Sequence, residues 1–443
     1  MTETVNKAKE KNVNVGTGRL LLIMCWVVYA SAYVARGNLS IARSVMIDQG
    51  IFDAGVAGIV GAVYFGVYAA GQVLNGILAD RKSPFVLVTI GVMIVIVANF
   101  GMGFHMPPYY YIICWGINGI GQSMLWSPVY FIVSTMLPER QKYFGVIAIG
   151  LCAPVGKIVS SLLSGAVIGD TKWSNAFFAA SLVMMGASIL WIAGYLSVRK
   201  GVAAHAEHLK REDKIDKRDR KEKKGKEKIS LAPLVAGGFL LMIPSLIVYG
   251  LLYNGVVELV PSILISNYGM TPFGAAVLNV VIPILGTVGV LMCGFVYKHV
   301  TKRDEMKGAA LSMALCLIPL ALMIVLTLSE GGIMFGKKID ALIFAVSYGV
   351  IYLLQCTVGT FFMNYIPLKF ASFNLAATAS GFANAVCYFG SAFSVYGMSY
   401  AVEYLPLSTI MIFLGGTALL SSLLFIPTCI KWSRFKRENE SGK

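Results

Sequence analysis

Residues 20–46 have the sequence LLLIMCWVVYASAYVARGNLSIARSVM, in which two arginines interrupt an otherwise apolar run. About 20 helical residues cross a bilayer core about 30 Å thick, so this stretch predicts a membrane-spanning helix. Arg36 falls within that helix. A guanidinium stays charged in proteins, and near the bilayer centre it costs about 2.5–3.5 kcal/mol on insertion scales. We therefore expect Arg36 to face a cavity, where it would bind an anion.

Composition extends the membrane assignment to the whole chain. Of its 443 residues, 57% are hydrophobic and only 13% are charged, whereas about 25% are charged in an average soluble domain. Twelve stretches are long and apolar enough to span a membrane, which predicts an all-α membrane protein. They lie at residues 18–45, 54–78, 85–104, 109–137, 143–168, 173–198, 233–266, 272–297, 308–329, 339–366, 374–400 and 407–430.

The net charge of +15 is explained by topology rather than by nucleic-acid binding. With the N-terminus placed in the cytoplasm, most of the 37 Lys and Arg residues fall in the two tails and the even-numbered connections. This distribution is the positive-inside bias of membrane proteins. It predicts a multi-pass protein of the cell membrane with both termini in the cytoplasm. We expect it to be a monomer that contacts lipid and binds no nucleic acid.

One long polar segment divides the chain. Residues 199–230 carry 13 Lys or Arg and seven Asp or Glu, and opposite charges four residues apart favour a partly helical linker. Six predicted spans precede it and six follow. We therefore expect an N-terminal half at 1–198, a cytoplasmic linker at 199–230 and a C-terminal half at 231–443. Two such six-helix, pseudo-symmetric halves describe the major facilitator fold.

A short motif supports this architecture. The second span ends in Gly76-Ile-Leu-Ala-Asp80-Arg81, in which the glycine allows close helix packing. Asp80 and Arg81 are expected to lock the cytoplasmic helix ends in one state and release them in the other. The corresponding position in the second half is Lys298, so that copy of the motif is degenerate.

Three regions resemble one family within this architecture. They are YVARGN at 33–38, NGIGQSMLWSP at 118–128, and AATASGF at 376–382 with YFG at 388–390. Together they resemble the organophosphate:phosphate antiporters, which include bacterial glycerol-3-phosphate and hexose-6-phosphate transporters. The resemblance implies that one arginine of the first helix and one of the seventh clamp the substrate phosphate. Arg36 matches the first of these. Glu258 and Pro261 resemble the family's acid and proline in the seventh helix, and this match puts Tyr253 where the second arginine is expected.

Other basic positions of that family are also lost. Gly37, Gln72 and Pro154 stand where the resemblance implies two lysines and a histidine. Arg36 alone supplies one bidentate pair of hydrogen bonds, and Lys157 could add a point charge but not a fork. A carboxylate or sulfonate monoanion suits such a site better than a phosphate dianion. An organophosphate is the alternative, with Lys157 and Arg43 replacing the lost residues.

The remaining charges within the predicted spans are candidates for gating or coupling. Arg43 lies two helical turns beyond Arg36 on the same face, about 10 Å away, either in an outer vestibule or anchored at the headgroups. Lys157 either lines the cavity or pairs with a structural partner. Glu258 either pairs with a cation as a gate, which we favour, or carries a proton.

Polar aromatic and amide side chains are expected to contact the uncharged part of the substrate. The alternative for each of them is a contact between helices. These candidates are Tyr33, Gln122, Trp126, Tyr253 and Tyr388.

The sequence thus predicts a secondary transporter of a small organic anion that works by alternating access, through anion exchange or proton-coupled symport. A membrane receptor that senses a phosphorylated sugar without transporting it is the alternative. No paired carboxylates, metal-ligand cluster or complete phosphate-binding loop is visible in the sequence, so we expect neither an enzyme nor a cofactor or metal.

Overall fold

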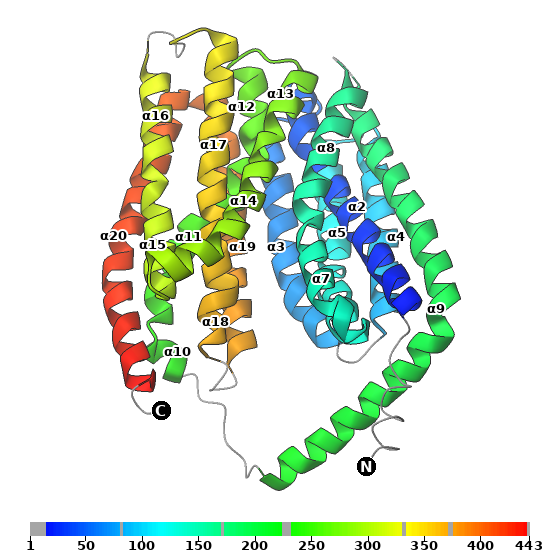
Figure 1. Cartoon of the computed structure of the whole chain (residues 1–443). Helices are drawn as coiled ribbons and strands as arrows, with labels where there is room; N and C mark the ends of the chain where they lie inside the picture. The colour runs from blue at the N-terminus through cyan, green and yellow to red at the C-terminus, as the bar shows by residue number, and fades with distance from the viewer. Residues whose placement is uncertain are drawn as a thin grey trace.

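The structure, a computed structural model, describes residues 15–79, 83–169, 172–223, 232–329, 334–370 and 375–440. These residues form helices and no strands. Figure 1 shows two helical bundles side by side, and the start of α2 and the end of α20 lie at the same end of the molecule. We call this end the terminal end and the opposite one the far end.

The described residues of the first bundle form eight helices and one π-helical turn. They are α2 (Val15–Asp48), α3 (Ala54–Ala79), α4 (Pro84–Met102), α5 (Pro108–Ser123), α6 (Trp126–Phe131), the π turn Ile132–Met136, α7 (Glu139–Gly150), α8 (Cys152–Ile168) and α9 (Ser174–Lys223).

The second bundle contains more helix interruptions. It comprises α10 (Ala232–Ala236), α11 (Phe239–Gly250), the π turn Leu251–Gly255, the 3₁₀ turn Val257–Leu259, α12 (Val260–Ser266), α13 (Pro272–Asn279), α14 (Val281–Phe295), the π turn Val296–Val300, α15 (Glu305–Leu315), α16 (Leu317–Leu328), α17 (Lys337–Thr360), the π turn Phe361–Tyr365, α18 (Ile366–Leu368), α19 (Ala376–Tyr404) and α20 (Leu407–Glu440).

The all-helical membrane fold agrees with the sequence-based expectation. The described residues contain ten helical runs that are long and apolar enough to cross a membrane. The other two predicted spans, 109–137 and 374–400, are helical too. The first of them is interrupted, because α5 ends at Ser123 after 16 residues, and the second is the long helix α19. The count of twelve spans stays a prediction.

The charged linker begins as a continuation of the sixth predicted span. Helix α9 runs unbroken for 50 residues, from Ser174 to Lys223, and projects beyond the two bundles in Figure 1. The expected helical character of the linker therefore holds as far as Lys223, and residues 224–230 lie outside the described part of the chain. The division into halves at residues 198 and 231 stays a prediction.

Buried apolar side chains form separate cores in the two bundles. One cluster draws on residues between 21 and 198 and a second on residues between 234 and 435. A third cluster lies around the far end of α2, and there Ala276 and Val395 of the second bundle pack among residues of the first. The two bundles are therefore joined by apolar contact at the far end.

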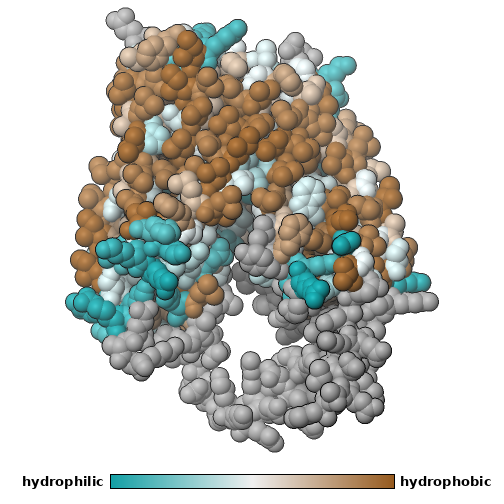
Figure 2. Space-filling view, in the orientation of Figure 1, coloured by the Kyte–Doolittle hydropathy of each residue, from teal (hydrophilic) through white to brown (hydrophobic). Residues whose placement is uncertain are grey.

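Two glycines let the helices approach closely at this junction. A Cβ atom at Gly165 of α8 would lie 2.5 Å from the Cβ of Ala276 in α13. A Cβ atom at Gly58 of α3 would lie 2.9 Å from the backbone oxygen of Tyr396 in α19. At the terminal end, by contrast, Figure 2 shows the surface hollowed between the bundles. The structure is thus closed at the far end and open at the terminal end.

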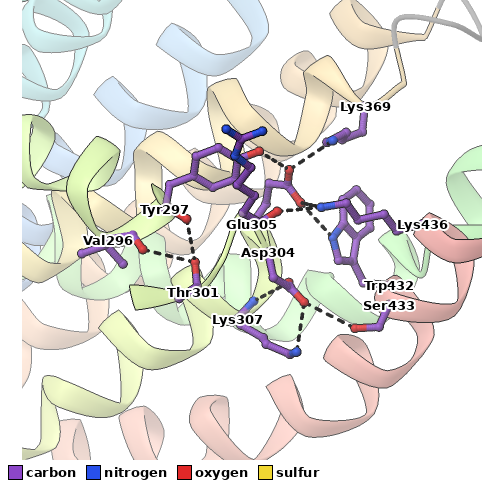
Figure 3. Close-up of polar contacts among 11 residues, drawn as sticks. Val296, Tyr297, Thr301, Asp304, Glu305, Lys307, Lys369, Trp432, Ser433 and Lys436 are labelled. Carbon is purple, nitrogen blue, oxygen red and sulfur yellow. Dashed lines mark hydrogen bonds and ion pairs between the residues drawn. The ribbon is translucent and has the colours of Figure 1, made fainter. Parts of the chain in front are cut away.

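A charged network fastens the second bundle at the terminal end (Figure 3). Glu305, the first residue of α15, is fully buried. Its carboxylate lies 3.3 Å from the Nζ of Lys436 in α20 and 3.5 Å from the Nζ of Lys369. It also accepts hydrogen bonds from the Tyr297 hydroxyl at 3.0 Å and the Trp432 indole at 3.4 Å. One carboxylate therefore ties α15 to α20 and to the segment after α18.

Replacing Glu305 by Gln should lower the stability of the protein. The change removes the charge that balances Lys369 and Lys436 but keeps the side-chain shape. Because both lysines are partly exposed, we expect a loss of about 1–3 kcal/mol rather than that of a fully buried pair. Thermal unfolding of the purified protein measures it, with the exposed Glu438→Gln as the matched control. Equal unfolding midpoints for the two variants would contradict a stabilising role for the network.

Replacing Gly165 by Val should separate α8 from α13 and open the far end. The added side chain cannot be accommodated, because the atoms facing it belong to Ala276 and to the backbone. Ser161, one turn away and buried at the same junction, accepts a hydrogen bond from Asn279 across it. A Ser161→Cys reporter should therefore react faster with a soluble maleimide in the Gly165→Val background.

Gly186→Val is the control for this experiment, because a Cβ atom at Gly186 meets no other atom within 4 Å. Unchanged reactivity of the Ser161→Cys reporter in the Gly165→Val background would show that the close approach at Gly165 does not hold the far end shut.

Candidate functional site

The orientation of α2 is fixed by polar side chains of its neighbours. Asn99 of α4 donates to the backbone oxygen of Ala35 at 3.0 Å, and Gln122 of α5 donates to that of Ala32 at 2.7 Å. Ser160 of α8 donates to the oxygen of Val34 at 2.9 Å. These bonds come from three helices and attach to one turn of α2, so they set the direction in which the next turn presents its side chains.

That next turn carries Arg36, which is only 7% exposed. Four aromatic rings surround its guanidinium, with the Cζ atom 5.2–5.8 Å from each ring centroid. The rings belong to Tyr33, Tyr64, Phe65 and Tyr68. Cation–π attraction stabilises a charge held in this way. The cage stabilises the charge without satisfying it, because the Nε of Arg36 is buried and has no hydrogen-bond partner.

A small cavity adjoins the caged guanidinium, with a volume of about 30 Å³, room for about one water molecule. Arg36, Arg43 and Tyr64 line it from the first bundle, and Glu258 and Val395 from the second. The hydroxyl of Tyr64 is buried and also lacks a hydrogen-bond partner. Two buried donors without a hydrogen-bond partner therefore belong to residues that line this one small space between the bundles.

A second cavity of similar size lies on the α8 side of Glu258. Lys157 and Ser161 of α8, Asn279 of α13 and Pro283 of α14 contribute to its lining, together with Glu258. The Nζ of Lys157 donates a hydrogen bond of 3.0 Å to the Tyr352 hydroxyl of α17. Lys157 therefore has both a cavity and a cross-bundle partner, which combines the two alternatives expected from the sequence.

Tyr352 belongs to a stack of three tyrosines in the second bundle. The ring of Tyr253 lies between those of Tyr249 and Tyr352, 5.1 Å from each and nearly parallel to both. Tyr253 stands where the family resemblance implies a second arginine. At this place the second bundle presents aromatic faces and hydroxyls instead of a fixed positive charge.

The other expected substrate contacts are placed as follows. Tyr388 of α19 packs against the Tyr68 ring at 5.0 Å, which extends the cage to the second bundle. The ring of Trp126 packs against that of Tyr29, and the Tyr29 hydroxyl lies 3.3 Å from the Tyr33 hydroxyl. The amide nitrogen of Gln122 donates a hydrogen bond to the backbone of α2. This is the contact between helices that was the alternative to a substrate contact. Their roles toward a substrate stay predictions.

The candidate gating residues are only partly visible. Glu258 is half-buried in the 3₁₀ turn Val257–Leu259, and it forms no ion pair or hydrogen bond with a described residue. Arg43 is buried and lines the same cavity as Glu258. Asp80 and Arg81 lie outside the described residues, so the motif at the end of the second span stays an expectation.

The sequence analysis missed three members of the cage and the tyrosine that Lys157 contacts. Tyr64 and Tyr68 are four residues apart in α3 and thus share one helix face, which is the signal that could have found them. Gln72, one turn further, donates a hydrogen bond of 2.6 Å to the Tyr68 hydroxyl. Gln72, which stands where the family resemblance implies a lysine, thus bonds to a member of the cage.

Chemically, the groups between the two bundles are of the kind that bind anions. Arg36 offers a charge with a free N–H, Tyr64 offers a hydroxyl, and Lys157 offers a second positive charge that its tyrosine partner does not neutralise. An anion that engages them gains charge-assisted hydrogen bonds, which are roughly twice as strong as neutral ones.

Comparison with known proteins finds relatives that are named as transporters. The chain is 23% identical over 155 residues to the probable hexose phosphate transport protein of Chlamydia trachomatis, covering 35% of this chain and 34% of that one. It is 20% identical over 286 residues to the hexuronate transporter of Bacillus subtilis, covering 65% and 66%. The matched segment thus spans about a third of the first relative's length. These relatives support a transporter rather than an enzyme.

Solved structures and one family model match most of the chain. A POT family transporter in complex with 5-aminolevulinic acid superposes with a TM-score of 0.69 at 15% identity, over 94% of this chain and 96% of that one. The family model of the Major Facilitator Superfamily matches residues 25–395. The resemblance seen in the sequence is thereby confirmed at the level of the fold, and the chain belongs to the Major Facilitator Superfamily of multi-pass membrane transporters.

Proposed function

We propose that the protein is a secondary transporter that moves a small organic monoanion, a carboxylate or sulfonate, across the membrane by alternating access. The observation that carries this proposal is the caged Arg36, whose buried Nε has no partner and which lines a cavity between the two bundles. A buried donor without a partner costs about 1–3 kcal/mol, and a ligand oxygen at this position would recover that loss.

The number of charges favours a monoanion over a phosphate dianion. Arg36 supplies one bidentate fork, and the corresponding place in the second bundle holds Tyr253 within a stack of rings. Lys157 adds one point charge, already hydrogen-bonded to Tyr352. One fork suits one carboxylate or sulfonate group. The tyrosine hydroxyls and ring faces suit an uncharged, hydroxylated body such as that of a hexuronate.

The same charges explain why transport would require a substrate. Closing the terminal end around an empty site would leave Arg36 in a medium of low dielectric without a counter-charge, which is costly. An anion that binds Arg36 removes this cost and permits the two bundles to rock about the site. The open terminal end would face the cytoplasm, in keeping with the positive-inside distribution of charge.

Arg36→Lys should weaken the binding of glucuronate about ten- to a hundredfold. Lysine keeps the positive charge within the aromatic cage but cannot form the fork. The loss of a charged hydrogen bond is worth about 1.5–3 kcal/mol, and every 1.4 kcal/mol is a factor of ten. Titration of the purified protein, followed by thermal shift, gives the two dissociation constants.

The matched control is Arg199→Lys, because Arg199 is an exposed cation of α9 outside the site. Near-normal affinity in the Arg36→Lys variant would remove Arg36 from the role proposed here. Counterflow of labelled glucuronate in proteoliposomes separates a carrier from a receptor, because a receptor would bind glucuronate without any flux.

Lys157→Gln should shift selectivity toward less charged ligands. Without its point charge, the site should lose more affinity for a hexose phosphate dianion than for the glucuronate monoanion. Competition of both compounds against labelled glucuronate measures the ratio. Tyr352→Phe keeps the charge and removes only the hydroxyl acceptor, so it should change this ratio less. An unaltered ratio in Lys157→Gln would assign Lys157 a structural role.

A further inference from the structure

Arg43 is a second cation of α2 to which the proposed function assigns no role. Its side chain is only 5% exposed. It lies seven residues beyond Arg36, about 10 Å farther along the helix, and lines the same cavity, beside Glu258. A guanidinium keeps its charge even when it is buried, so this one must be stabilised by other charges of the protein or by a ligand.

The polar groups around Arg43 lack partners within the protein. Arg43 forms no hydrogen bond or ion pair with any residue that the structure describes. The hydroxyl of Ser44, the next residue, is buried and has no hydrogen-bond partner. The same holds for Ser262 of α12, a helix that packs against α2. Buried polar groups are normally hydrogen-bonded, so these groups are available to a ligand.

Two carboxylates act on Arg43 through space without forming an ion pair with it. They belong to Glu258, which lines the same cavity, and to Glu403 of α19. Glu403 is exposed, so water and salt screen its charge. Glu258 is shared, because the two cavities that it lines are also lined by Arg36 and Lys157. Three cations and one acid leave these cavities with two excess positive charges, which attract anions.

Arg36 and Arg43 are separate places for an anion. A carboxylate or sulfonate group pairs with the fork of one guanidinium at a time, and the two residues lie two helical turns apart. Ser40 lies about one turn from each of them and lines both cavities. A small anion can therefore pass from one arginine to the other along one face of α2, but it cannot pair with both at once.

Arg43 lies between Arg36 and the closed far end. Helix α2 runs from the terminal end toward the far end (Figure 1), so residue 43 is the farther of the two arginines along it. Ala57 of α3 lines the cavity together with Arg43, and the next residue, Gly58, makes the close approach to the backbone of Tyr396. When the far end opens, an anion that enters from this side thus meets Arg43 before Arg36.

We propose that Arg43 is a second anion-binding site, to which the carboxylate or sulfonate group of the substrate binds on its way between the far side and Arg36. This inference rests on the proposed transport function and adds a binding step to it. Arg43 raises the local concentration of anions at the open far end, and Arg36 then binds the anion inside the aromatic cage. Uncharged solutes gain nothing from the first step, so Arg43 contributes to the selectivity for anions.

A Ser40→Cys reporter in the full-length protein tests this proposal. Right-side-out membrane vesicles expose the far side to the medium in the proposed orientation. The thiol is modified there by 2-sulfonatoethyl methanethiosulfonate, a sulfonate monoanion, and separately by the cation 2-(trimethylammonium)ethyl methanethiosulfonate. Opening of the far end and ionisation of the thiol affect both rates equally, so the anion-to-cation rate ratio reports the local charge. Protein without the reporter gives the background from the native cysteines, of which seven of eight are buried.

Arg43→Gln should lower this ratio about tenfold, which corresponds to 1.4 kcal/mol, because the lost charge attracts one reagent and repels the other. Arg43→Lys keeps the charge and should keep most of the preference. Arg199→Gln, which removes an exposed cation of α9 outside the site, is the matched control and should leave the ratio unchanged.

Salt gives a second measurement that needs no substitution at Arg43. Raising the ionic strength from about 0.01 M to about 0.15 M shortens the Debye length from about 30 Å to about 8 Å, so the ratio of the reporter protein should fall. If Arg43→Gln misfolds, reaction of the buried native cysteines would reveal it, and Arg43→Met then takes its place.

Two results would overturn the proposal. One is an equal ratio with and without Arg43→Gln. The other is an equal ratio in Arg36→Gln and in the double variant Arg36→Gln/Arg43→Gln, which would assign the attraction of anions to Arg36 alone. Neither result depends on transport. Absence of wild-type counterflow with glucuronate, a sulfonate and a hexose phosphate alike would instead contradict the transport function, while the reporter still decides whether Arg43 attracts anions.

Discussion

The arrangement between the two bundles depends on one constraint, which is that the charge of Arg36 must be stabilised inside a membrane protein without being permanently neutralised. Four aromatic rings meet the first requirement, because they attract the cation but form no hydrogen bond with it. The free Nε beside the cavity meets the second. An acidic partner would have satisfied the guanidinium, whereas the proposed anion site requires that it stay unsatisfied.

The rest of the molecule keeps this group in place between the two bundles. Side chains of α4, α5 and α8 bond to the backbone of α2 just before Arg36 and so fix the rotation of the helix. Close packing at Gly165 and Gly58 shuts the far end, while the terminal end is open. The network around Glu305 lies away from the site and ties α15 to α20 and to the segment after α18.

Much of this could be predicted from the sequence, for identifiable reasons. A membrane span is a local property of composition, and an arginine within one stands out, so the fold class and Arg36 could both be predicted from the sequence. The cage was not, because Tyr64, Phe65 and Tyr68 are ordinary apolar-face residues until α3 is placed beside α2. The stack of Tyr249, Tyr253 and Tyr352 likewise depends on how α17 packs. The helix interruption after Ser123 does have a local cause, because Pro128 lacks the N–H that would bond the backbone oxygen of Met124, four residues earlier.

The central claim is that Arg36 binds the anionic group of a transported substrate. Its most direct test is an experimental structure of the protein with glucuronate bound. The account predicts a carboxylate within hydrogen-bond distance of the Arg36 guanidinium, in contact with its Nε, and with the aromatic cage retained. A glucuronate bound elsewhere, with the guanidinium still unpartnered or paired with a protein carboxylate, would contradict it.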